Sequence, residues 1–263
     1  MKTTMKIIKY QFNDILRSRW TIVYTLFFLA ITYSILSMSG NITKSIISLM
    51  NIFLFVVPLV SIIFGTVYLY NNREYIIFMI AQPINKDALY AGLYAGVSVS
   101  QIISLLVGAG IPLAFNYPTI SGSVVDLMIL FGSGIFGILI FTSIAFAITI
   151  INDNRLFGFG MSIFLWLVFT IIYDGLILLL LFFMRDYPTE KLALVLSFIN
   201  PIDLGRMLIV LRMDISALMG YTGAVFNEFF GSNAGMVASF IALSIWAVVP
   251  YYLGLIKFRR KDF

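Results

Sequence analysis

Long apolar runs constrain what this chain can fold into. A helix needs about 20 apolar residues to cross the hydrocarbon core of a bilayer. Stretches of that length with few or no charges lie near residues 20–39, 47–70, 91–115, 127–150, 158–184 and 234–257. The runs are continuous rather than alternating, which argues against barrel strands, so each must satisfy its backbone as a helix. The sequence predicts an all-α polytopic membrane protein, with residues 1–263 as a single transmembrane domain.

The composition agrees with a membrane protein. The chain is 61% hydrophobic and 11% charged, whereas soluble domains carry about 25% charged residues. It has no cysteine and no histidine. That absence excludes a disulfide framework, the usual zinc sites, thiol catalysis and histidine-based triads.

The lysines and arginines predict the orientation. An even number of spans puts both termini on one side. That side carries the basic segment 1–19 and a larger set of cations, which are Arg73, Lys86, Arg155, Lys257, Arg259, Arg260 and Lys261. The other side has Lys44, Arg185, Lys191, Arg206 and Arg212. The asymmetry places both termini in the cytoplasm of a bacterial inner membrane, and the net charge of +5 is read as this orientation signal rather than as a nucleic-acid site.

Residues 1–19 combine basic residues with apolar ones at helical spacing. This pattern predicts an amphipathic helix in the interface, against anionic lipid headgroups. A cleavable signal peptide is the alternative.

Small residues mark the third and fourth spans. In the third span they recur every four positions, at Gly92, Gly96, Ser100, Ser104 and Gly108. Such a stripe lets helix backbones approach closely in lipid. Packing within one chain is favoured over a dimer seam. Gly132, Gly134 and Gly137 of the fourth span are interpreted in the same way.

The inner loop, residues 71–90, contains an apolar segment, Tyr75–Ala81, that is too short to span. It predicts a short helix at the membrane face. Gln82–Lys86 follows as a turn, because the residue before Pro83 avoids the helical region. The helix is either an interfacial anchor or a docking element for a cytoplasmic partner.

This loop resembles that of the ABC-2 type permeases. The order of an acid, an apolar stretch, proline, a basic residue and glycine is met by Glu74, Pro83, Lys86 and Gly92. The chain lacks the Gly-Thr pair that usually follows the acid. It also has leucine where lysine often follows the last glycine. The basic tail, Lys257–Lys261, is similar to that family's C-terminus.

The resemblance implies that a separate ATPase subunit docks on this loop. We expect Tyr75, Phe78 and Met79 to be its anchors, with Arg73, Glu74 and Lys86 at the rim. The chain has no Gly-x-x-x-x-Gly-Lys-[Ser/Thr] sequence, so ATP and Mg are expected in the partner and no cofactor on this chain.

Asp174 lies well inside the fifth span. A carboxylate there costs roughly 2.5–3.5 kcal/mol on insertion scales, so it normally faces the bundle interior with a partner. The candidates are Arg206 and Arg212, provided that the outer segment, 185–233, folds back. The acid is either structural, as part of an ion pair or as a protonated, hydrogen-bonded group, or it takes part in a conformational change.

Two short amphipathic helices are predicted on the outer membrane face. Asn200 caps the second, Pro201 suits its first position and Asp203 favours its dipole. Arg206 can pair with Asp203 three residues earlier. The first helix starts near Tyr187 and runs through Phe198. Copper ligation by methionines is not expected, because Met207, Met213 and Met219 do not share a helix face.

The same stretch resembles a narrower group, the permease subunits of transporters that serve nitrous oxide reductase maturation. The similar parts are Tyr173–Asp174, Phe198–Asp203 with Arg206, and the basic segment ending in Arg17–Trp20. The resemblance implies a homodimeric, non-catalytic permease with two ATPase copies and a periplasmic partner on the outer helices. It also implies a role in assembling a copper centre.

Three other functions are considered. The chain could be an ABC-2 exporter for a lipid, peptide or drug. An intramembrane enzyme or a passive anchor belongs to a different class. Only Asp174 suggests intramembrane catalysis, and a lone acid without a positioned second group is poor evidence for it.

Overall fold

The computed structural model describes residues 19–39, 41–115, 124–184, 190–212 and 233–261. The predicted interfacial helix in 1–19 lies almost wholly outside the described residues, as do Met213 and Met219. The regular structure within the described ranges is all helical, which confirms the predicted fold class.

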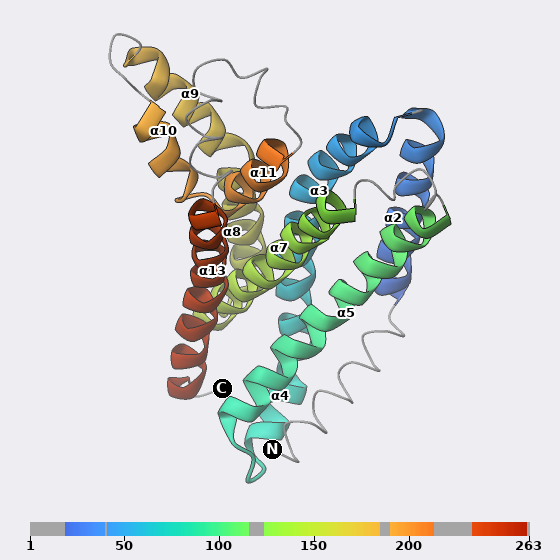
Figure 1. Ribbon diagram of the computed structural model, residues 1–263. Helices are drawn as coiled ribbons and strands as arrows, with labels where there is room; N and C mark the ends of the chain where they lie inside the picture. The colour runs from blue at the N-terminus through green and yellow to red at the C-terminus, as the bar shows by residue number, and fades with distance from the viewer. Residues whose placement is uncertain (1–18, 40, 116–123, 185–189, 213–232, 262–263) are drawn as a thin grey trace.

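Each apolar run forms one spanning unit, giving six candidate spans in the described residues. The helices of these units are α2 (Arg19–Ser39), α3 (Ile42–Asn71), α5 (Lys86–Phe115), α7 (Val124–Ile151), α8 with α9 (Arg155–Leu167 and Tyr173–Phe183), and α13 (Asn233–Arg260). Three shorter helices connect them, namely α4 (Arg73–Ile80), α10 (Glu190–Ser197) and α11 (Pro201–Arg212). Figure 1 shows α4 at one end of the bundle, here called the α4 end, and α10 and α11 at the other, the α11 end.

Helix α7 is the centre of the bundle. It contacts α3, α5, α8, α11 and α13. Its sequence is apolar on all sides, which is typical of a helix surrounded by others. The core beside it includes an edge-to-face aromatic series in which Phe53 meets Phe28 at 5.3 Å and Phe131 at 5.8 Å between ring centroids.

The small-residue stripe of the third span packs inside the chain. All five of its members are buried, and α5 lies along α2. A β-carbon at Gly108 would lie 2.6 Å from the Thr25 carbonyl oxygen and 2.9 Å from Phe28 Cβ. The interpretation as packing within one chain is therefore confirmed at Gly108.

The fourth-span glycines behave differently from one another. A β-carbon at Gly134 would lie 2.9 Å from Leu105, whereas one at Gly137 would be 3.7 Å from Val57. Gly132 faces open space within the described structure. Close packing was wrong for Gly132, because that position points away from the neighbouring helices.

The fifth span is not the single α-helix that the sequence predicted. A π-helical segment, η2 (Val168–Ile172), separates α8 from α9, directly before Tyr173 and Asp174. No residue of η2 or α9 is fully buried. A single π turn inserted in an α-helix frequently marks a functional site.

We predict that Gly108→Ala destabilises the protein by roughly 1–3 kcal/mol, because the added methyl group forces α2 and α5 apart. Gly110→Ala is the control on the same helix, since nothing lies within 4 Å of a β-carbon there. It should leave stability unchanged or raise it by up to about 1 kcal/mol. Thermal unfolding in detergent measures both. Equal melting temperatures for the two variants would contradict the packing described.

Candidate functional site

Helix α4 is held against the bundle by one face. Ile76 is 3% exposed, in a cluster with Tyr90, Phe146 and Phe258. Tyr75 and Met79 pack partly against the same cluster. The short helix after the second span is confirmed, and so is the turn between it and α5.

The opposite face of α4 is open. Phe78 is 63% exposed and Ile77 is 41% exposed, and Glu74 shares this side. Of the three expected anchors, Phe78 is therefore presented outward, while Tyr75 and Met79 are engaged within the chain. Ile77 was not among the expected residues. With Ile76 fixed in the core, the helical period directs Ile77 and Phe78 away from it.

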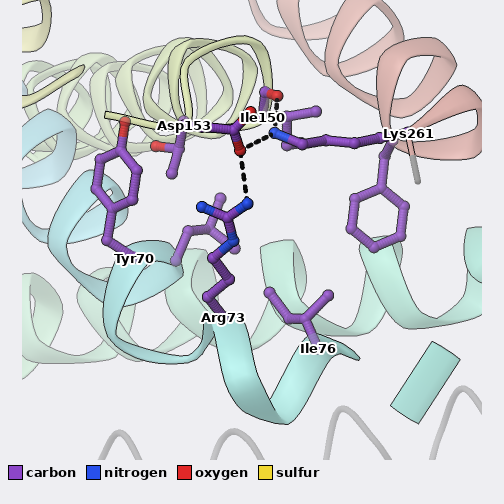
Figure 2. A pocket seen from close by; sticks show the side chains of 9 residues that line it. Tyr70, Arg73, Ile76, Ile150, Asp153 and Lys261 are labelled. Atoms are coloured by element: carbon purple, nitrogen blue, oxygen red, sulfur yellow. Dashed lines mark hydrogen bonds and ion pairs between the residues drawn. The ribbon is translucent and has the colours of Figure 1, made fainter. Parts of the chain in front are cut away.

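Asp153 joins three segments at the α4 end. It accepts hydrogen bonds from Arg73 Nη2 at 2.7 Å and from Lys261 Nζ at 2.8 Å. Lys261 Nζ also donates to the Ile150 carbonyl at 2.7 Å. Figure 2 shows this arrangement around a cavity of about 20 Å³, which is room for about one water molecule. Arg73 thus links α4 to the α7–α8 turn rather than standing free at a rim.

The Lys261 ammonium, hydrogen-bonded to Asp153, holds the pKa of that carboxyl below its ordinary value, with Arg73 adding to the effect. The carboxylate is therefore charged at neutral pH, as the two ion pairs require. Sequence analysis missed Asp153 because its partners lie 80 and 108 positions away.

Lys86 binds the end of α13. Its Nζ donates to the carbonyls of Arg259 at 3.2 Å and Lys261 at 3.3 Å, the carbonyls that a helix C-terminus leaves without intrahelical donors. Beside it, Arg259 binds Asp87 with two parallel hydrogen bonds. Lys86, expected at the rim of the docking surface, is thus engaged within the chain, while Pro83 is exposed in the turn.

The α7–α8 turn is also fixed to α3. Arg155 Nη2 donates to the Tyr70 carbonyl at 2.9 Å, and the Tyr70 hydroxyl donates to the Asn152 carbonyl at 2.8 Å. Any β-carbon at Gly158 would overlap the Tyr70 hydroxyl group. At this end, polar contacts therefore join α4 and α3 to the α7–α8 turn and α5 to the end of α13.

At the α11 end, the expected partner of Asp174 is Arg206. Arg206 Nη1 lies 2.9 Å from Asp174 Oδ2 and 3.3 Å from Asp203 Oδ1. Both predicted pairs, Asp174 with Arg206 and Asp203 with Arg206, are confirmed. The side chain of Arg212, the other candidate, lies outside the described structure.

Asn200 performs two tasks. Its Oδ1 accepts from the Ile202 backbone N–H at 3.0 Å, which confirms the predicted cap. Its Nδ2 donates to the Phe169 carbonyl, inside η2, at 2.8 Å. A π turn leaves a carbonyl without its i+4 donor, and Asn200 supplies a replacement. The start of α11 is therefore tied to the irregular part of the fifth span.

Helix α11 does not lie on the membrane face as expected. Its first five residues, Pro201–Gly205, are all buried, and the helix contacts α3, α7, α13 and η2. A β-carbon at Gly205 would lie 3.0 Å from Leu54, so glycine permits this insertion. The sequence pattern correctly gave α11 a polar side. The partners of that side lie inside the bundle, so the helix is inserted there rather than placed on the membrane face.

Burial raises the pKa of Asp203 to about 7, with the nearby Asp174 charge adding to the rise and Arg206 opposing it. Within the described residues, no group of three or more acidic side chains could hold a metal ion. The features of this end are therefore an arginine between two carboxyls and a capping asparagine.

The spanning helices carry a short helix, α4, docked at one end and an inserted helix, α11, at the other. These features define a polytopic membrane protein with a network of polar contacts at each end. Residues 5–263 match the family described as ABC-2 family transporter protein. The chain belongs to that family.

Two curated relatives are similar over almost the whole chain. Both are described as probable ABC transporter permease protein NosY. The relative from Pseudomonas aeruginosa is 20% identical over 277 residues, and the one from Stutzerimonas stutzeri is 22% identical over 281 residues. Each alignment covers 99% of this chain and 99% of the relative. The resemblance found in the sequence is confirmed.

We predict that Asp153→Asn loosens the C-terminal tail, because the neutral amide weakens both ion pairs. Exposed pairs contribute about 0–1 kcal/mol, so tryptic cleavage in the tail should accelerate by about two- to five-fold. Asp126→Asn, an acid at the other end of the bundle, is the control and should leave the rate unchanged. If Asp153→Asn is cleaved at the wild-type rate, Asp153 does not hold the tail.

Proposed function

We propose that this chain is the permease subunit of an ABC transporter acting in nitrous oxide reductase maturation. In this role it couples ATP hydrolysis by a NosF-like ATPase to a periplasmic NosD-like protein during copper-centre assembly. The observation that carries the coupling role is α4, fixed by Ile76 and Arg73 while Phe78 faces outward. Similarity over the full length to two NosY permeases supports the maturation role.

The proposed location is the bacterial inner membrane, with both termini and α4 in the cytoplasm. Cations collect at the α4 end, where the described residues include Arg73, Lys86, Arg155, Arg259 and Lys261. Such an excess is typical of a cytoplasmic side. The subunit is non-catalytic, and ATP with Mg belongs to the ATPase chains.

The ATPase is proposed to dock on the exposed face of α4. Ile77 and Phe78 supply an apolar anchor, and Glu74 lies beside them. Anchors of this kind carry most of the binding energy of an interface. Arg73 of α4 binds the α7–α8 turn, and Lys86, at the start of the next helix, α5, binds the end of α13. A displacement of α4 is therefore proposed to act on several helices together.

The NosD-like protein is proposed to dock on α10 and α11. There the Asn200 bridge and the Asp174–Arg206 pair make the fifth span and α11 one unit, here called the outer unit. Two copies of the chain are proposed to form the permease. The second candidate function is an ABC-2 exporter for a lipid, peptide or drug, which membership of the family supports equally well.

We predict that Phe78→Ala weakens ATPase binding by about tenfold or more, because it removes a central anchor. Phe115→Ala is the matched control, a phenylalanine that is 84% exposed at the opposite end. Binding is measured by titrating purified ATPase onto permease in nanodiscs. Equal affinities for the two variants would mean that α4 does not dock the ATPase.

The outer unit is tested by two substitutions at Asn200. Asn200→Ala removes both the cap and the bond to Phe169, and should cost about 1 kcal/mol of local helix stability through the cap alone. Asn200→Ser keeps a capping oxygen but lacks the amide donor. Both variants should lose stimulation of the ATPase by the NosD-like protein while binding the ATPase normally.

The comparison between the two variants separates the cap from the bridge. If Asn200→Ser retains full stimulation, the contact with the π-helical segment is not part of coupling. If both variants retain it, the outer unit has no such role and the exporter becomes the better function.

A further inference from the structure

The Asp174–Asp203–Arg206 cluster contains two acids and one base. The same guanidinium nitrogen, Arg206 Nη1, serves both carboxyls, at 2.9 Å and 3.3 Å. The two carboxyl groups are also within hydrogen-bonding reach of each other. With every group charged, the cluster would carry one unit of excess negative charge.

The groups around Asp203 do not offset this excess negative charge. Asp203 is 6% exposed, and α11 is inserted between α3, α7, α13 and η2. The charged and titratable groups that act on Asp203 are Asp174 and Arg206, and Tyr173 stands beside both acids with its hydroxyl donated to the Leu196 carbonyl. Around the start of α11, the helices α3 and α7 present Leu54 and Ser133.

Two carboxylates in a common, poorly solvated site rarely both ionise, since one proton relieves both repulsion and desolvation. One bound proton makes the cluster electrically neutral and allows a hydrogen bond between the two acids.

We propose that Asp174, Asp203 and Arg206 form a proton-binding site that takes one proton from the α11 side of the membrane and thereby tightens the outer unit. This inference rests on the proposed function only in taking the outer unit to be the part that binds the periplasmic partner. Access is open, because the side chains of Arg206 and Asp174 are 34% and 31% exposed.

The raised pKa of Asp203, about 7, places the change in charge near neutrality. Because the folded-state pKa lies above the ordinary value of about 4, the folded form binds more protons between those two values. The stability that the folded protein gains from this bound proton is therefore greatest at low pH and is lost as the pH rises through about 7. Loss of the proton restores the excess charge and pushes α9 and α11 apart.

The test uses the full-length permease in nanodiscs at pH values about one unit below and above neutrality. Infrared spectroscopy should show the band of a protonated carboxyl at the lower pH, declining at the higher pH. Asp203→Asn should lack that band. Asp126→Asn, which alters an acid outside the cluster, should keep it.

Hydrogen exchange of the α11 amides gives a second readout. After correction for the intrinsic effect of pH, exchange in the wild-type protein should quicken several-fold at the higher pH. In Asp203→Asn the rate should not depend on pH, because the amide is neutral throughout. Arg206→Lys should preserve the pH dependence, since the cation remains.

A wild-type protein without the carboxyl band at the lower pH would overturn the proposal. So would equal pH dependence in wild type and Asp203→Asn. Both measurements omit the ATPase and the periplasmic partner. They can therefore fail while the Asn200 experiments succeed, and the reverse also holds.

Discussion

Hydrocarbon offers no hydrogen-bond partner, and this constraint places nearly every polar feature of the molecule. Within the spans, many hydroxyl groups bond to the carbonyl one turn earlier, as Ser100 does to Gly96, or to a neighbouring helix, as Ser61 does to Gln101 at 2.7 Å. Apart from Asp174 in the fifth span, the charged side chains of the described residues lie toward the ends of the bundle. The features that can respond to a partner are therefore concentrated in two places, joined by apolar helices.

The ion pairs at the two ends of the bundle differ in how exposed they are. At the α4 end the ion pairs of Arg73, Asp87, Asp153 and Arg259 are largely exposed, and each contributes about 0–1 kcal/mol. Such pairs can be exchanged without unfolding the core. At the α11 end the partners of Arg206 are more enclosed, so a change of charge there has a larger effect on packing.

The sequence predicted the parts that depend on local properties. Run length and hydropathy gave the spans, and the pattern around Asn200 gave a capped helix whose acid pairs with Arg206. The inserted position of α11 was not predictable, because it depends on the space that Gly205 leaves beside Leu54. Asp153 was missed for a similar reason, since only the fold brings it to Arg73 and Lys261. The outward side of α4 depends on Ile76 entering a core formed by distant helices.

The fifth span takes part in the polar contacts of both ends. Its first residue, Arg155, bonds to α3 beside Asp153, and Asp174 near its other end bonds to Arg206. Neither η2 nor α9 has a fully buried residue, so few packing contacts resist displacement of this segment. The π turn is held by the bond from Asn200 and by Phe169, whose ring packs edge-to-face on Trp246 at 5.4 Å between ring centroids. In the proposed coupling, a force applied at α4 can therefore move the fifth span with the α7–α8 turn, and the Asn200 bridge and the Arg206 pair pass that movement to α11. The tightly packed pair of α3 and α7 has no comparable freedom, which makes the fifth span the better route.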